Sequence, residues 1–338
     1  MAKHRITELL GDGISPELSK AVRSLLKSLP CKIEVDPVDL TLKRRRKEAK
    51  RAYDEALSSM SRSDATLKYP TTTESESPNK VLRERCGFSV IHRPCTTIPG
   101  VPTNFRKPLD VDIVRVATGG TYDDAGRRIG LDSAVSVRVI ERQPCLQAAR
   151  FAFRLASSQG RTVISSSKYT IQQATDGLFE EAVEEVARDF PKVPRQRILF
   201  DSLLARLTMR PEQVQVVGCP NEDGDFLSDA AAGLIGSLGL ADSASYSFDD
   251  KGEISLALFD PAGGSAPDIA GKNLANPTAV FFAVSTMLTH LGERALARRV
   301  KSAVMDCLAE GTATRDLGGT LGTTQFTDAV IETFQKKF

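Results

Sequence analysis

Histidine is scarce in this sequence, and its cysteines are not paired. The 338 residues include only His4, His92 and His290, and the six cysteines form no CxxC pair. Zinc sites and disulfide frameworks normally need closely or regularly spaced cysteine and histidine residues. A Ser-His-Asp hydrolase would have to use one of the three histidines. These classes are therefore disfavoured, and any bound metal is expected to be held by carboxylates, which favours Mg²⁺ or Mn²⁺.

The sequence also lacks a charge excess and a long apolar run. Lys and Arg number 45 against 43 for Asp and Glu, and no stretch approaches the roughly 18 apolar residues of a membrane helix. We therefore expect neither nucleic acid nor a membrane as a partner. Residues 1–10 carry charges and no signal-peptide core, which predicts a cytoplasmic location. The basic run Lys43–Lys47 is interpreted as a solvated helix face, with nucleic-acid binding as a remote alternative.

Apolar spacing predicts strands that alternate with helices along the chain, which is the pattern of an α/β fold. Ser15 and Pro16 are predicted to be the N-cap and first-turn residues of the first helix. Strands are expected at 6–10, 65–68, 111–116, 163–167 and 214–218, and helices at 16–29, 43–61, 146–157, 178–190, 230–238, 278–291 and 295–308.

Two aspartates stand four residues apart in an acidic segment. At the start of a helix, this spacing places Asp225 and Asp229 on one face. Two such carboxylates repel each other unless a cation lies between them, and a divalent ion with oxygen ligands would suit. Aspartate is also common at helix N-termini, so capping is the alternative.

Three arginines lie near predicted strands. Arg83, Arg93 and Arg115 could each grip a carboxylate in bidentate geometry, and together they would suit a di- or tricarboxylate. Taken singly, each arginine is more often part of a surface ion pair. Whether they converge is left open by the sequence.

Two glycine-rich segments suggest nucleotide contacts to different degrees. Gly11-Asp12-Gly13 begins a GxGxxG fingerprint, but Pro16 occupies the position of the third glycine, so a standard Rossmann fold is not expected. The loop from Gly263 to Lys272 offers backbone N–H groups and small residues for close approach to a nucleotide. An ordinary surface turn explains that loop equally well.

The order of several motifs resembles that of the β-decarboxylating dehydrogenases: isocitrate, homoisocitrate, isopropylmalate and tartrate dehydrogenases. The resemblance covers almost the whole chain, and NAD-dependent isocitrate or homoisocitrate dehydrogenase is the nearest type. The matching segments are Gly11–Ile14 with Pro16-Glu17, Asp176–Phe179, Asn221 with Gly224-Asp225 and Ser228-Asp229, Gly264–Lys272, Asn276-Pro277 and Asp316–Gly319.

This resemblance implies a fold and an assembly. The expected fold is α/β, with two domains around a central cleft, and it is not a standard Rossmann fold. Residues 1–98 and 239–338 would form a large, cofactor-binding domain, and 99–238 a small domain that carries the metal site, the substrate site and the dimer interface. An arm near 117–143 would join two copies in a homodimer whose active sites are shared between subunits.

It also implies roles for individual residues. Asp201, Asp225 and Asp229 would bind the metal, Arg83, Arg93 and Arg115 the malate part of the substrate, and Tyr122, Lys168 and Asp201 would be catalytic. Lys168 and Asp201 would reach the site of the neighbouring subunit. Without the resemblance, Tyr122 would be interpreted as a turn residue and Lys168 as a surface lysine at a strand end.

The chemistry implied is oxidation followed by decarboxylation. The metal would chelate the substrate hydroxyl and its adjacent carboxylate, which lowers the hydroxyl pKa. Lys168, with Asp201, would assist removal of the hydroxyl proton, and hydride transfer to the nicotinamide would give a β-keto acid. After CO₂ leaves, Tyr122 would protonate the enolate.

Substrate and cofactor choice depend on two loops. In this family the segment before Arg83 sets the substrate, and here Ser77 and Asn79 are polar, which favours an anionic third substituent. Isocitrate is the favoured substrate, with homoisocitrate, 3-isopropylmalate or a phosphonate such as phosphonomethylmalate as alternatives. The alternative role for Ser77 is simply to cap a helix. The acidic Asp268 favours NAD over NADP, although Arg210 could pair with a phosphate. The expected cofactor contacts are Thr71, Gly264, Ser265, Ala266, Pro267, Asp268, Ile269 and Asn276.

The chain departs from the family pattern at five positions. Val116 and Asp260 stand where glutamate is usual, Gly263 where histidine is usual, Thr170 where asparagine is usual and Ser15 where glycine is usual. The lost glutamate at Val116 and the lost histidine at Gly263 motivate a second class of function, a non-catalytic regulatory subunit. The metal, arginine, tyrosine and lysine residues are nevertheless present, and we expect an active enzyme.

Overall fold

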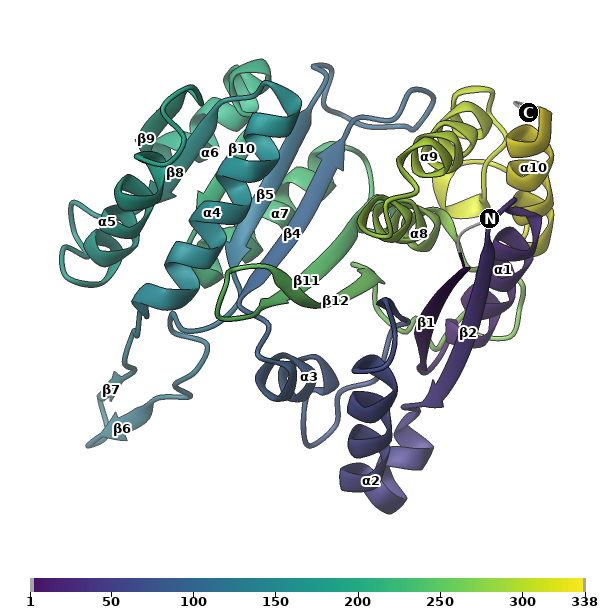
Figure 1. Cartoon of the computed structure of the whole chain (residues 1–338), viewed down its shortest axis with the longest axis horizontal. Helices are drawn as coiled ribbons and strands as arrows, with labels where there is room; N and C mark the ends of the chain where they lie inside the picture. Colours follow the sequence, from purple (N-terminus) through teal and green to yellow (C-terminus); the bar gives the residue numbers. More distant parts are fainter. Residues whose placement is uncertain (1–2, 337–338) are drawn as a thin grey trace.

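A single ten-stranded sheet forms the centre of the molecule, and helices cover both of its faces (Figure 1). The computed structural model describes residues 3–336. In spatial order the strands are β2 (Lys32–Asp39), β1 (Lys3–Leu10), β3 (Ala65–Lys68), β12 (Ile254–Pro261), β11 (Asp242–Phe248), β4 (Val90–Thr96), β5 (Asp110–Val116), β10 (Val216–Cys219), β8 (Val163–Ser167) and β9 (Arg195–Leu199).

Two parallel blocks make up this sheet. Strands β2, β1, β3 and β12 run parallel to one another, and so do β5, β10, β8 and β9. Antiparallel pairings of β12 with β11, β11 with β4 and β4 with β5 join the blocks. Because the blocks therefore run in opposite directions, their carboxyl ends, where ligands bind in open α/β sheets, lie at opposite edges of the sheet.

Ten α-helices are found in the described part of the chain. They are α1 (Ser15–Ser28), α2 (Leu42–Met60), α3 (Pro78–Cys86), α4 (Arg142–Gln159), α5 (Thr175–Ala187), α6 (Phe200–Met209), α7 (Asn221–Leu234), α8 (Thr278–His290), α9 (Arg294–Ala309) and α10 (Thr323–Lys336). Helix α4 lies over β5 and β10 on the near face, and α7 lies behind β5 (Figure 1). None of these helices is long and apolar enough to cross a membrane.

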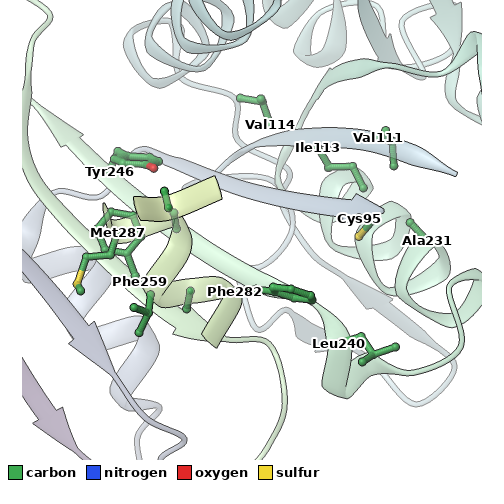
Figure 2. Close-up of a cluster of buried hydrophobic side chains, with 14 of the residues drawn as sticks. Cys95, Val111, Ile113, Val114, Ala231, Leu240, Tyr246, Phe259, Phe282 and Met287 are labelled. Atoms are coloured by element: carbon green, nitrogen blue, oxygen red, sulfur yellow. The ribbon is translucent and has the colours of Figure 1, made fainter. Parts of the chain in front are cut away.

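The main hydrophobic core is continuous across the antiparallel middle of the sheet. Figure 2 shows side chains of β4 and β5, such as Cys95 and Ile113, in the same cluster as Phe259 of β12 and Met287 of α8. These four side chains are almost completely buried. One core thus spans both parts of the predicted division into 1–98 with 239–338 and 99–238, and that division stays a prediction.

A small two-stranded ribbon projects away from the sheet. Strands β6 (Arg127–Ile129) and β7 (Ser133–Val135) pair only with each other, within the predicted arm at 117–143 (Figure 1). Ile129 and Leu131 of this ribbon are 58% and 91% exposed. An isolated two-stranded ribbon is only marginally stable in water and needs further packing. Ile129 and Leu131 are exposed, so within this chain they do not supply that packing.

The predicted α/β class is confirmed, while some local predictions were wrong. The helix expected at 230–238 is the end of α7, which begins earlier, at Asn221. Ser15 does not cap α1 from its N-cap position. It is the first residue of the helix, and its hydroxyl donates to the carbonyl oxygens of Asp12 and Pro70. Strands β2, β4, β9, β11 and β12 were not predicted. Strand β2 contains Pro37, which is tolerated because this strand lies at the edge of the sheet.

Replacing a buried residue of β12 should destabilise the fold far more than replacing an exposed residue of the same strand. Phe259 is fully buried, so Phe259→Ala should lower the free energy of unfolding by about 3–5 kcal/mol through lost burial and a residual cavity. Ile254 is 37% exposed, and Ile254→Ala should cost less than about 1.5 kcal/mol. Urea titration of both variants measures the difference, and equal losses would contradict this assignment of the core.

Candidate active site

Asp225 is the centre of a charged cluster built from β4, β5 and α7. Its Oδ1 accepts hydrogen bonds from Arg115 on β5 and from Arg93 on β4, the latter at 3.2 Å. Its Oδ2 accepts one from the hydroxyl of Tyr122 at 3.0 Å. Burial alone would raise the pKa of Asp225, but Arg115 and Arg93 outweigh it and hold the pKa below its usual value. Asp225 is therefore an ionised carboxylate between two arginines.

Arg115 owes its position to two residues of α7. Its side chain is 3% exposed, and its Nε donates to Oδ1 of Asn221 at 2.8 Å. Gly224 makes room for it, because a Cβ at that position would lie only 2.6 Å from the Cβ of Arg115. Burial, together with the nearby charge of Arg93, lowers the pKa of Arg115 to about 10, so the group is still a cation at neutral pH.

The third predicted arginine lies in the same electrostatic environment. Arg83, on α3, is half-buried, and its pKa is lowered first by burial and then by the charge of Arg93, while Asp225 acts in the opposite direction. Arg83 and Arg93 likewise appear among the charges that act on Arg115. The convergence that the sequence left open is thus present in part: Arg93 and Arg115 contact the carboxylate of Asp225, and Arg83 lies near enough for its charge to interact with theirs.

Asp229 lies one helical turn beyond Asp225, as its spacing predicts. Its side chain is 64% exposed and contacts Arg93 at 3.5 Å. The capping alternative does not describe either residue, because the N-cap of α7 is Pro220 and no side chain caps it. Within residues 3–336 no three acidic, histidine or cysteine side chains form a group that could hold a metal. The two aspartates of α7 would need a further ligand from elsewhere.

Tyr122 belongs to a turn that α7 pins in place. Asn221 donates to the carbonyl oxygen of Gly119, and Glu222 accepts from both the backbone N–H and the hydroxyl of Thr121, at 3.0 and 3.1 Å. Tyr122 is 41% exposed, and its ring lies 5.7 Å from the guanidinium carbon of Arg115. Burial, followed by the negative charge of Asp225, raises the pKa of Tyr122 and keeps its hydroxyl protonated at neutral pH.

Lys168 and Asp201 form a second, separate group. Lys168 directly follows β8, Asp201 lies in the first turn of α6, and their charged atoms are 3.2 Å apart. This hydrogen bond is the main cause that lowers the pKa of Asp201. In the part of the chain that the structure describes, no hydrogen bond or ion pair joins Lys168 or Asp201 to Asp225, Tyr122 or the three arginines.

The Gly11-Asp12-Gly13 turn serves loop packing, which explains the incomplete fingerprint. A Cβ on Gly13, whose φ is +59°, would lie 1.8 Å from the carbonyl oxygen of Ser265, and that oxygen accepts from the N–H of Ile14. A Cβ on Gly11 would similarly meet the carbonyl oxygen of Pro70 at 2.0 Å. The turn thus fixes the predicted cofactor loop against the end of β1.

Among the predicted cofactor residues, Ser265 lies directly beside this turn. The Thr72 hydroxyl, next to Thr71, donates to the Ser265 hydroxyl at 3.4 Å. Gly264 and Asp268 are exposed, and a Cβ on Gly263 or Gly264 would meet open space. Ala266, between Ser265 and Pro267-Asp268-Ile269, has a φ of +38°. Asn276 donates to Asp316 at 2.9 Å, which ties the loop end to the segment before α10.

The basic run was wrongly interpreted as a solvated face at one position. Arg45 is 6% exposed and donates to Leu40 O, Thr72 O and Asp12 Oδ2. Its neighbour Arg46 is exposed and forms a bidentate pair with Glu74. Helix α2 therefore anchors the loop at 71–77 through these two arginines, instead of presenting all its basic groups to solvent.

Ser77 and Asn79, the predicted substrate-selecting residues, open helix α3. Ser77 is the N-cap, and its hydroxyl accepts from the N–H of Lys80 at 3.4 Å, so the capping role is present. Asn79 is exposed. Both residues lie less than two helical turns before Arg83, on the element that brings this arginine to the cluster around Asp225.

Several residues that organise the site were given no individual role in the sequence analysis. Asn221 and Glu222 follow β10 directly, and that position was the available signal. Asp12 and Arg45 fix the loop at 71–77, and Ser228 accepts from Arg93 at 2.6 Å. Each acts on a partner far away in the chain, which no local pattern reveals.

The sequence and structure were compared with known proteins. The isocitrate/isopropylmalate dehydrogenase family matches residues 5–330. The chain is 37% identical to the isocitrate/homoisocitrate dehydrogenase of Thermus thermophilus, over 97% of this chain and 98% of that protein. It is 35% identical to the NAD isocitrate dehydrogenase catalytic subunit 5, mitochondrial, of Arabidopsis thaliana, over 95% and 86%. The crystal structure of isocitrate dehydrogenase from Methylococcus capsulatus superimposes with a TM-score of 0.88 at 32% identity, covering 98% of this chain and 99% of that one.

Adding one methyl group at Gly224 should disturb Arg115. Because the Cβ of Gly224→Ala would lie 2.6 Å from that of Arg115, we expect a loss of about 1–3 kcal/mol in the free energy of unfolding. Gly233, on the same helix, has no atom within 4 Å of a Cβ position, so Gly233→Ala should be neutral or stabilising. Urea titration compares the pair, and a harmless Gly224→Ala would refute the proposed close contact.

A buried carboxyl next to the site should make stability depend on pH. Asp223 is 8% exposed, and burial raises its pKa to about 7. Since the unfolded pKa is near 3.8, the folded chain binds the extra proton between these values, and stability from this group falls as pH rises through that window. Asp223→Asn should therefore stabilise the protein by at least about 1 kcal/mol more at pH 8 than at pH 4. Thermal unfolding at both pH values checks this, and a pH-independent difference would contradict it.

Proposed function

The chain belongs to the isocitrate/isopropylmalate dehydrogenase family, which consists of decarboxylating dehydrogenases, and on that premise we propose that it is an NAD-dependent and divalent-metal-dependent enzyme that oxidises and decarboxylates isocitrate. Homoisocitrate is the second candidate substrate, followed by 3-isopropylmalate and a phosphonate analogue such as phosphonomethylmalate.

The observation that carries this proposal is the pairing of Arg93 and Arg115 with Asp225, with the charge of Arg83 close by. The three guanidinium groups outnumber the two carboxylates of this cluster, Asp225 and Asp229. A ligand with two or three carboxylates would neutralise that excess and accept bidentate hydrogen bonds. The Nε of Arg93 is buried without a hydrogen-bond partner, so it is a donor still available to such a ligand.

The residues fit a hard divalent ion. Asp225 and Asp229 offer carboxylate oxygens from one face of α7, and Asp201 of a second copy would supply the ligand that a single chain lacks. Such an ion would act as a Lewis acid on the substrate hydroxyl and its neighbouring carboxylate. The carboxylate of Asp225 would then exchange part of its arginine contacts for the ion, while the arginines turn to the substrate.

The exposed loop at 263–269 fits a dinucleotide. Its glycines leave open space, and the exposed carboxylate of Asp268 can accept hydrogen bonds from ribose hydroxyls and would repel a 2′-phosphate, which favours NAD. Bound NAD would accept the hydride. The missing ring at Gly263 removes one stacking surface, so we expect the remaining contacts, from Thr71 to Asn276, to hold the adenosine part.

Proton transfer would be carried out by two residues of this chain. Lys168, held 3.2 Å from Asp201, would remove the hydroxyl proton. Tyr122, whose raised pKa keeps its hydroxyl protonated, would donate a proton to the carbon left when CO₂ departs. Because these residues belong to separate groups in one chain, each active site would combine Tyr122 of one subunit with Lys168 of the other.

A homodimer is therefore part of the proposal. Besides Ile129 and Leu131 of the ribbon, Ile171, Met209 and Phe226 expose 58–73% of their surface. Ile171 follows Lys168 and Phe226 follows Asp225, so the exposed apolar side chains adjoin both groups. Burying them in a second copy would bring the two groups together. A cytoplasmic location, without nucleic-acid or membrane partners, stays a prediction.

Activity with a substrate panel tests the proposal directly. With Mg²⁺ or Mn²⁺ and NAD, NADH absorbance at 340 nm should rise with isocitrate or homoisocitrate, and at least about tenfold less with isopropylmalate, because Ser77 and Asn79 would leave polar groups unpaired against an apolar substituent. Removing the metal with EDTA should abolish turnover, and added Mn²⁺ should restore it. Tartrate, malate and phosphonomethylmalate complete the panel.

Each other outcome has a defined meaning. A preference for isopropylmalate would refute the assignment of Ser77 and Asn79, but would leave the family chemistry in place. No turnover with any substrate, with NAD or NADP, would favour a non-catalytic regulatory subunit. In that case, the first variant to test would restore the family glutamate at position 116, where this chain has a buried valine.

A further inference from the structure

Arg138 bridges two buried carboxylates at the base of the arm. Its Nε and Nη2 donate to Oδ1 of Asp176 at 3.1 and 2.8 Å, and its Nη1 donates to Oε1 of Glu222. Asp176 and Glu222 are 0% and 6% exposed, and the side chain of Arg138 is 14% exposed. Three charges this deeply buried are costly unless they are paired with good geometry. Among the described residues, Arg138 is the cation that bonds to both carboxylates.

Each carboxylate also holds the backbone of a proposed proton-transfer residue or its neighbour. Oδ2 of Asp176 accepts from the backbone N–H of Lys168 at 2.7 Å. Oε1 of Glu222 accepts from the backbone N–H of Thr121 at 3.0 Å, directly before Tyr122. Gly120 permits this contact, because a Cβ there would lie 1.8 Å from Oε2 of Glu222. The two carboxylates therefore hold the backbone at Lys168 and next to Tyr122, and this sets the positions from which these two side chains extend.

We propose that Arg138 is a positioning residue that holds the Tyr122 turn and the Lys168 strand end in a fixed relation through Glu222 and Asp176. This proposal rests on the proposed function, in which Tyr122 and Lys168 serve the two different active sites of a dimer. One arginine would then couple the geometry of the two sites from within each subunit. Arg138 touches neither Tyr122 nor Lys168 by a hydrogen bond, so it would act only through the carboxylates.

The local sequence supports a specific rather than a general role. Val139, next to Arg138, exchanges backbone hydrogen bonds with Gly120. The segment that contains Arg138 therefore already lies against the Tyr122 turn without the help of the Arg138 side chain. The guanidinium adds a link from that segment to Asp176 and thus to the end of β8. Losing it would leave Glu222 and Asp176 buried without a counter-ion, and Oε2 of Glu222 has no hydrogen-bond partner to compensate.

Steady-state kinetics of Arg138 variants give the first test. Arg138→Gln should lower kcat about tenfold or more while the KM for the substrate changes less than about twofold, because placement of proton-transfer groups affects the reaction more than binding. Arg138→Lys keeps the positive charge but loses the planar, bidentate donor geometry of the guanidinium, so its kcat should lie between those of the wild type and Arg138→Gln. Arg142, four residues after Arg138, forms an exposed ion pair with Glu185. Arg142→Gln removes this pair and should leave kcat unchanged.

Hydrogen–deuterium exchange of the dimer gives a test that does not depend on activity. Arg138→Gln should speed exchange in peptides covering 119–123 and 166–170 together, because both N–H acceptors lose their anchor, while peptides of β1 and α1 keep the wild-type rate. Glu222→Gln should speed exchange at 119–123 alone. Because Glu222→Gln should affect only residues 119–123, it distinguishes a local loosening of that segment from the proposed link between 119–123 and 166–170.

Two results would overturn the proposal. One is a kcat loss in Arg138→Gln no greater than in Arg142→Gln. The other is faster exchange throughout the chain, or in one segment only, which would give Arg138 a general or one-sided structural role. If the wild-type protein turned over no substrate, the proposed function would fail, but joint loosening of both segments would still establish the link, and its absence would refute the link.

Discussion

The start of α7 is the constraint on which the rest of the site depends. The helix begins directly after β10 without a capping side chain, so its first turn is free to bond to other elements. Asn221 orients Arg115 and holds Gly119, Glu222 holds Thr121, and Gly224 lets Arg115 lie against the helix. The first turn of α7 thereby fixes Arg115 and the turn that carries Tyr122, and the following turns of the same helix carry Asp225 and Asp229.

The electrostatics of the site follow from this arrangement. Arg115 is buried and Asp225 is half-buried, and each charge is tolerated because the other is close by. In the absence of a ligand, Arg93 and Arg115 are held by Asp225, which would suit the proposed binding of a metal and a polyanion followed by product release. Asp223 shows the contrasting case: its buried oxygen lacks a partner, so its pKa rises to about 7 instead of falling.

Two sequence patterns acquire a different meaning once the loops are placed. The glycines of Gly11-Asp12-Gly13 resemble a nucleotide fingerprint, yet their missing side chains make room for Pro70 and Ser265. The basic run in α2 resembles a solvent-exposed face, yet Arg45 is buried against Asp12 and Thr72. In both cases the deciding neighbour is distant in the chain, 27 and 33 residues away even for Arg45, and local spacing gives no information about it.

The sequence alone determined the α/β class, most strands and helices of the two parallel blocks, and the motifs that identify the family, because these depend on local periodicity and on short segments. It also placed Asp225 and Asp229 on one helix face, since four residues make about one turn. The tertiary structure decided how far Arg83, Arg93 and Arg115 converge, the separation of Lys168 and Asp201 from them, and the bridging role of Arg138. These depend on which strands and loops meet in space, and only the folded backbone sets those distances.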